Sequence, residues 1–62
     1  MKIWIAERLM ARPNVENRPV VGIIKGERKE GFLVSFDGVN AVILPTRKVR
    51  TFSCAIEDVQ PR

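Results

Sequence analysis

The chain has 62 residues, with 11 lysines and arginines against seven aspartates and glutamates, and its net charge is +4. It has no histidine and one cysteine, Cys54, so neither an intrachain disulfide nor a Cys/His zinc site is available to stabilise it. A domain of this size buries only about 60% of the surface of its unfolded chain, which predicts marginal stability for a lone monomer. The positive charge fits a polyanion-binding protein, but it fits an ordinary protein surface equally well.

The composition also limits the classes of function. No histidine base, phosphate-binding loop or pair of catalytic carboxylates is visible, so we expect no enzymatic activity, no cofactor and no metal. Residues 1–8 reach charged side chains too early for a signal-peptide core, and no apolar run has the length that spans a bilayer. We therefore expect a single cytoplasmic domain, residues 1–62, with no membrane partner.

The first segment, residues 3–12, is compatible with a helix or with a strand. As a helix it would gather these apolar side chains on one broad face: Ile3, Ile5, Ala6, Leu9 and Met10. Residues 3–5 alone would suit a strand, but the alanine, glutamate, arginine and leucine that follow favour a helix. Pro13 ends either element, and residues 13–19, with two prolines and two asparagines, predict a connector.

Residues 20–40 contain two apolar runs that are punctuated by glycines. Gly26 and Gly31 lie on either side of the charged run 27–30, which predicts a hairpin turn followed by a sharp bend in the next strand. After Gly31 the side chains alternate in the period-two pattern of a strand with one face in a core, and Asp37-Gly38 then predicts a reverse turn. The candidate core side chains of this strand and the next are Phe32, Val34, Phe36, Val42 and Leu44.

The whole pattern predicts a mainly β chain with five strands near residues 20–25, 31–37, 40–45, 48–54 and 55–60. Residues 45–47 are the expected loop between the third and fourth strands, and Pro61 is expected to stop further pairing because proline has no amide hydrogen. Three bent strands in succession favour a small, strongly bent barrel over residues 20–60, preceded by a helix or strand and a linker over residues 1–19. Short last strands would leave backbone groups at its edge for a neighbouring copy.

One sequence of signals is shared with a known family. The signals begin with an apolar pair, Ile23-Ile24, and a glycine, Gly26, followed by four residues, 27–30, and a second glycine, Gly31. An apolar strand, residues 32–36, then leads to Asp37 and Asn40. This order resembles the first motif of the Sm-like family, which includes the Sm and LSm proteins and Hfq. Residues 55–59 are similar to the last strand of Hfq, and the brevity of the chain resembles the compact Sm-like proteins of phages, including cyanophages. The resemblance implies an Sm-like, SH3-type barrel that forms a closed homo-oligomeric ring and binds RNA.

The chain departs from the family at two places that contact RNA. Ser53-Cys54 stands where Sm proteins have Arg-Gly and Hfq has Lys-His, which removes a cation. Gly38-Val39 stands where the family offers an aromatic residue, His or Met to a base, and such stacking is worth ~1 to 3 kcal/mol per base. We therefore expect a weakened central RNA site. Cys54 itself is expected to be a small buried hydrophobe, because no histidine exists to activate it.

The candidate RNA-binding residues are Asp37, Val39, Asn40, Arg47, Lys48, Arg50 and Ser53. Five of them have a plainer interpretation. Asp37 would accept hydrogen bonds from turn amides, and Asn40 would cap the same turn instead of reading a base edge. The three cations would contact phosphates, or they would form a solvated loop tip.

The expected oligomer is a homo-oligomeric ring in which the fourth strand pairs with the fifth strand of the next copy. We expect about five to seven copies in the ring, and we favour the lower half of this range. Its candidate interface residues are Val49, Thr51, Phe52, Cys54 and Ile56. Two functions stay open at this point. One is a ring-forming protein with a role in RNA binding or RNA metabolism, and the other is a barrel that acts as a protein-interaction or structural module without RNA.

Overall fold

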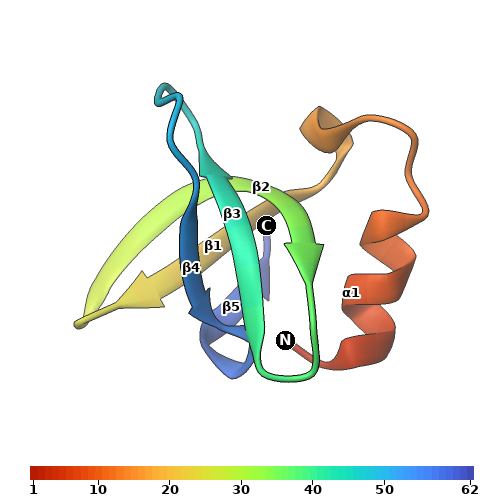
Figure 1. Ribbon diagram of the computed structural model, residues 1–62, viewed down its shortest axis with the longest axis horizontal. Helices are drawn as coiled ribbons and strands as arrows, with labels where there is room; N and C mark the ends of the chain where they lie inside the picture. Colours follow the sequence, from red (N-terminus) through yellow and green to blue (C-terminus); the bar gives the residue numbers. More distant parts are fainter.

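A short helix and five antiparallel strands make up the fold in the computed structural model, which describes all of residues 1–62 (Figure 1). The elements are α1 (Ile3–Met10), β1 (Pro19–Ile24), β2 (Glu27–Phe36), β3 (Asn40–Pro45), β4 (Phe52–Ala55) and β5 (Val59–Pro61), with short 3-10 helices η1 (Val15–Asn17) and η2 (Ile56–Asp58). The prediction of a mainly β chain with five strands is confirmed. No helix has the length and apolar character needed to cross a membrane.

The N-terminal segment forms a helix rather than a strand. Ala6 and Leu9, three residues apart on one face of α1, are buried in the core beside the sheet. The helix ends at Met10, two residues before the end that the sequence predicts. Arg18 Nη2 donates to the backbone oxygen of Met10 at 3.4 Å and to that of Arg12, just beyond the helix, at 2.7 Å, so a cation lies at the carbonyl end of α1. The connector therefore holds α1 against the sheet.

The β1–β2 turn is tighter than the sequence pattern suggests. Lys25 and Gly26 have φ values of 52° and 79°, as in the two-residue turns that suit hairpins, and Ile24 pairs directly with Glu27. The charged run 27–30, which we expected outside the strands, therefore belongs to β2. The predicted start of this strand at residue 31 was wrong because so short a turn lets pairing begin at once.

Gly31 is required by a close approach of two backbones. A Cβ at this position would overlap the backbone oxygen of Leu44 and would lie 2.7 Å from Cγ2 of Ile43. Gly31 pairs with Val20 on one side and with Pro45 on the other, and Figure 1 shows β2 curving over the sheet. The predicted bend in the second strand is therefore present, and its cause is crowding by β3.

A β-bulge sets which side chains of β2 face the core. The register between β2 and β3 shifts between Leu33 and Ser35, so that Leu33 pairs with Ile43 while Phe36 pairs with Ala41. Leu33 and Phe36 consequently contact the same core although they are three residues apart. The buried cluster consists of Ala6, Leu9, Val20, Leu33, Ala41, Ile43, Cys54, Ile56 and Val59, and Phe36 packs against it.

The predicted core face was therefore wrong at four positions. The side chains of Phe32, Val34, Val42 and Leu44 are only half-buried and lie outside the core cluster, and only Phe36 of the five candidates contacts it. Both faces of β2 and β3 carry apolar residues, so alternation alone could not choose the face that is buried. The burial of Cys54 agrees with its expected role as a small hydrophobe.

The strands form one sheet in the order β4-β3-β2-β1-β5, and no pairing joins β4 to β5. These two strands are the free edges. The fourth strand is shorter than predicted, because its pairing with β3 begins only at Phe52 opposite Ile43, so residues 48–51 form a loop. Thr51 therefore precedes β4 instead of lying within it.

The last strand begins later and ends later than predicted. Residues 56–58 form η2, and Pro61 pairs with Val20 instead of ending the sheet. The amide of Arg62 donates to the oxygen of Pro19 at 3.0 Å, and because bonded and non-bonded pairs alternate in an antiparallel ladder, the nitrogen of Pro61 faces the free edge. Proline is tolerated there because no partner strand needs its hydrogen.

Candidate nucleic-acid interface

The structure divides the predicted RNA-binding residues between the two ends of β3 (Figure 1). Three of them lie on the turn before β3 or at its start: Asp37, Val39 and Asn40. Another three lie in the loop after it: Arg47, Lys48 and Arg50. Ser53 lies between them on β4, paired with Val42. These residues therefore do not form one site within a single chain.

At the first end, the Asp37 carboxylate is used by its own turn. Its Oδ1 accepts hydrogen bonds from the amides of Val39 and Asn40, both at 2.7 Å. The amide of Asn40, followed by that of Val39, lowers the pKa of Asp37 below its ordinary value of 3.8. The plainer interpretation of Asp37 as a turn-forming residue is thus supported by geometry. Val39 offers only a small aliphatic side chain, 68% exposed, to any base.

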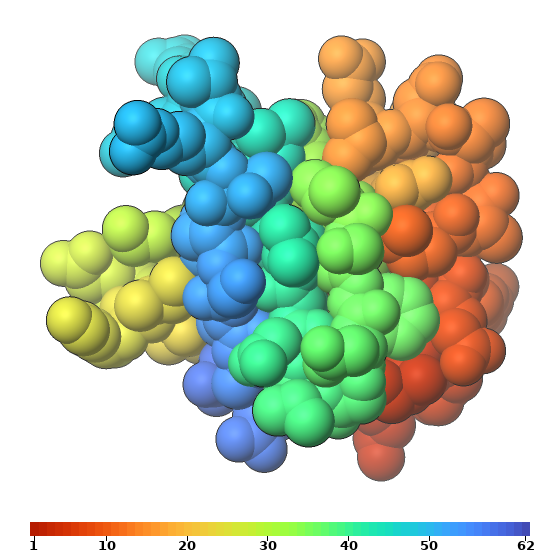
Figure 2. Space-filling view, viewed as in Figure 1, coloured from red at the N-terminus to blue at the C-terminus, as the bar shows by residue number.

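At the second end, two segments project beyond the sheet. One is the β1–β2 hairpin, whose residues 23–30 we call the arm, because β5 pairs with β1 only up to Gly22 and β3 pairs with β2 only from Gly31. The other is the basic loop, residues 46–51, between β3 and β4. Figure 2 shows a hollow between them.

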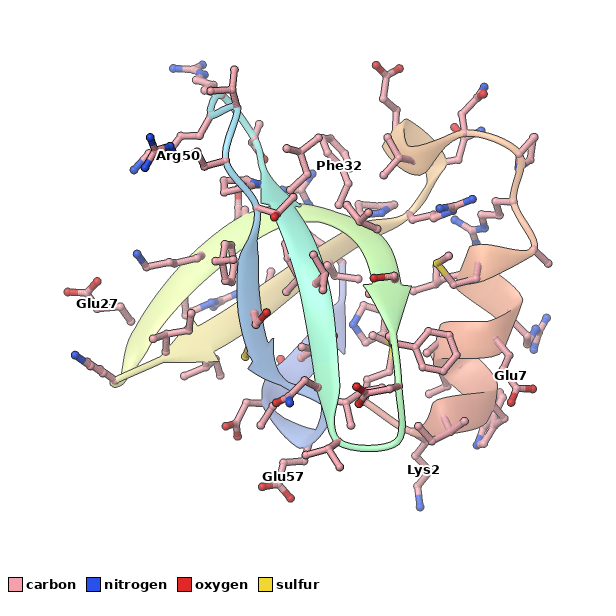
Figure 3. All side chains as sticks on the ribbon, viewed as in Figure 1. Lys2, Glu7, Glu27, Phe32, Arg50 and Glu57 are labelled. Carbon is pink, nitrogen blue, oxygen red and sulfur yellow. The ribbon has the colours of Figure 1, made fainter.

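This hollow, the basic groove, has a volume of about 590 Å³. It is lined by Lys29, Glu30, Pro45, Thr46, Arg47, Lys48, Arg50 and Phe52. Figure 3 shows the side chain of Arg50 extending from the basic loop at the edge of this region. The structure therefore joins the three predicted loop cations to a fourth, Lys29, which comes from the arm.

The charges lining the groove are unbalanced. Glu30 is its only acid, and Arg62 Nη1 lies 2.9 Å from Glu30 Oε2 in the only salt bridge of the structure. The four lining cations have no ion-pair partner in the chain. A concave surface with several unpaired cations attracts anions, and lysine and arginine are common partners of nucleic-acid phosphates.

One aromatic side chain, that of Phe52, lines the groove, and we call it the aromatic floor. Phe52 is half-buried and packs against the core, and its ring lies over the backbone of Gly22. A Cβ on Gly22 would come within 3.2 Å of Cε2 of Phe52 and 2.9 Å of Cδ1 of Ile43. Gly22 pairs with Lys29, so the ring of Phe52 and this lysine of the arm lie beside the same residue pair.

The basic loop is tied to the arm at its start. The amide of Thr46 donates to the oxygen of Glu30 at 3.2 Å, and the amide of Lys48 donates to the oxygen of Pro45 at 3.3 Å. Between them Arg47 has a φ of 152°, a backbone conformation that residues with a side chain rarely adopt. Such conformations concentrate at binding loops.

Sequence reasoning found the loop cations because they are close together in the chain. It missed Lys29, whose charge is locally balanced by neighbouring glutamates in sequence, and it assigned Phe52 only to an interface. The signal that was available is the pair Gly22 and Gly31, which marks where strands and side chains crowd together.

The predicted interface residues also separate into two kinds. Val49 is 95% exposed and Thr51 is exposed, both in the basic loop, whereas Cys54 and Ile56 are turned into the core of their own chain. Any contact that these last two make with another copy would use their backbone. Their role at an interface stays a prediction.

No protein-family model matches the sequence, and neither a curated protein nor a solved structure matches it. The likeness to Sm-like proteins is therefore the motif resemblance given above.

Proposed function

We propose that this protein is a ring-forming Sm-like protein that binds single-stranded RNA mainly through its phosphates, with a role in RNA metabolism. The observation that carries the proposal is the basic groove, in which Lys29 and three loop cations have no acidic partner. Phosphate contacts supply most of the affinity of proteins that bind nucleic acid without reading bases, so this surface predicts binding that weakens steeply with salt.

The turn at the other end of β3 is expected to contribute little. Asp37 is occupied by the amides of Val39 and Asn40, and no aromatic side chain is available there for a base. The side-chain amide of Asn40 makes no hydrogen bond within the chain and is the one group on this turn that could read a base edge. The central RNA site of the family is thus weak in this chain.

The two free edges support assembly into a ring. The amide of Ile56 donates to the oxygen of Val39 at 2.9 Å, so by alternation along β4 the backbone groups of Ser53 and Ala55 face away from β3. On β5, the oxygens of Val59 and Pro61 face the other free edge. The donors of one edge and the acceptors of the other would satisfy each other between copies, and a closed ring of about five to seven copies would leave no edge open.

A second candidate function is a protein-interaction module without RNA. The observation that favours it is on α1, where Trp4 is 55% exposed and Ile3 is 38% exposed. Exposed tryptophan is enriched where proteins meet. This surface is separate from the basic groove, so the two functions make different predictions.

The experiment that tests the proposal is a titration of labelled uridine-rich and adenine-rich oligonucleotides with the wild-type protein at several salt concentrations. We expect binding to both, with affinity that falls linearly in log–log form as salt rises. Absence of binding at low salt would reject the RNA function and leave the protein-interaction module.

A further inference from the structure

The basic groove has two walls that come from separate parts of the chain. The arm contributes Lys29, the basic loop contributes its three cations, and Phe52 of β4 also lines the groove. A phosphate chain that passes along the groove would meet positive charge on both sides. If the basic loop were only a solvated loop tip, there would be no reason for a cation on the opposite wall.

The ring of Phe52 is positioned to receive a planar group. It lies beside the backbone of Gly22, its residue pairs with Ile43, and it packs against the core while still lining the groove. Aromatic side chains beside a cationic groove are the platforms on which single-stranded nucleic acids stack their bases. The groove volume of about 590 Å³ lies within the range of small-ligand sites.

Paired bases do not offer their faces to such a floor, because in a duplex those faces are stacked on one another. An acidic peptide would satisfy the cations, but it would leave the aromatic floor without a partner. Single-stranded nucleic acid supplies both the phosphates and the flat apolar face.

We propose that the basic groove is a base-stacking site for single-stranded nucleic acid, in which one base lies on Phe52 while Lys29 and the basic loop hold the flanking phosphates from opposite sides. This inference rests on the proposed RNA-binding function and adds the base contact and the second wall to it. The site lies at the far end of β3 from the Asp37 turn. It uses the Phe52 side chain, whereas pairing at a sheet edge would use the backbone of β4.

The test compares a fluorescein-labelled oligouridylate with an abasic oligonucleotide of the same length, by anisotropy. Phe52→Leu keeps an apolar side chain against Ile43 and removes the aromatic face. It should weaken binding of the oligouridylate by about five- to 150-fold and leave binding of the abasic strand unchanged.

The second wall is tested by Lys29→Gln, with Arg28→Gln as the matched control on the same strand. Neighbouring side chains of a strand point to opposite faces, and Arg28 does not line the groove. Lys29→Gln should flatten the dependence of log affinity on log salt by about 0.7, and Arg28→Gln should leave it unchanged. If the two variants changed this slope equally, Lys29 would not form a second wall of the groove.

One measurement needs no variant and covers the case in which Phe52→Leu fails to fold. The ring protons of Phe52 in the wild-type protein should shift on adding oligouridylate and should not shift on adding the abasic strand. Unchanged ring protons would overturn the stacking site even if RNA binds, and the proposed function would then stand alone. If inorganic phosphate or polyglutamate displaced the labelled oligouridylate as well as unlabelled oligouridylate does, the groove would be a general anion site. That result would also overturn the inference.

Discussion

Arg62, the last residue, pairs with Glu30 on β2 and so neutralises the only acid that lines the basic groove, with 2.9 Å between Nη1 and Oε2. The side chains are 38% and 58% exposed, so the pair adds little to folding, about 0 to 1 kcal/mol. Its effect is on the potential of the groove.

Glu30→Gln should therefore strengthen oligonucleotide binding at low salt, and Arg62→Ala should weaken it, with little change in thermal stability for either. Anisotropy titrations at two salt concentrations measure this. Unchanged or tighter binding by Arg62→Ala would show that the freed Glu30 does not face the ligand.

Gly31→Ala is expected to disrupt the sheet. The new methyl group would overlap the backbone oxygen of Leu44, which cannot move aside as a flexible side chain can. We expect a loss of ~1 to 3 kcal/mol or more in the free energy of unfolding, measured by urea denaturation. Gly38→Ala is the matched control, because a Cβ there meets nothing within 4 Å. A harmless Gly31→Ala would mean that β2 and β3 lie further apart.

The observed core face is tested by neighbours on β2. Leu33 is fully buried and pairs with Ile43, so Leu33→Ala should cost ~2 to 5 kcal/mol in the free energy of unfolding. Val34 is half-buried at the bulge, and Val34→Ala should cost clearly less. If Val34→Ala lost more free energy of unfolding than Leu33→Ala, the buried face of β2 would be the one that alternation predicts.

Ring assembly is tested at the free edge of β4. Ser53→Pro removes an amide that faces away from β3, so the sheet of each copy keeps its bonds while the neighbour loses a donor. Thr51→Pro is a suitable control, because Thr51 lies outside β4. Light scattering coupled to size exclusion should show a closed oligomer for the wild type and for Thr51→Pro, and a smaller species for Ser53→Pro. A concentration-independent monomer in the wild type would defeat the ring.

The number of strands was predictable because Gly26 and the Asp37-Gly38 turn separate the first three, but Gly31 and Pro61 lie inside strands that they were expected to begin or end. The face of β2 that is buried was not predictable, since a bulge at residues 33–35 reverses the alternation and both faces are apolar. The basic loop was found from three nearby cations. The groove could not be predicted from the sequence, because Lys29 and Phe52 are 23 residues apart in the chain. They come together only because Lys29 pairs with Gly22, beside which the ring of Phe52 lies.

The proposed function depends on the binding of RNA phosphates by the basic loop. It is tested most directly by the salt dependence of oligouridylate binding for a variant with Arg47, Lys48 and Arg50 all changed to Ala. A variant with Lys2, Arg8 and Arg28 changed to Ala has the same reduction in charge outside the groove and serves as the control; Figure 3 shows Lys2 at the opposite end of the molecule from Arg50.

The slope of log affinity against log salt should flatten by about 0.7 for each phosphate that the loop variant no longer neutralises, or by about two in all, and should stay near the wild-type value for the control. Equal slopes for the loop variant and the wild type would contradict the account.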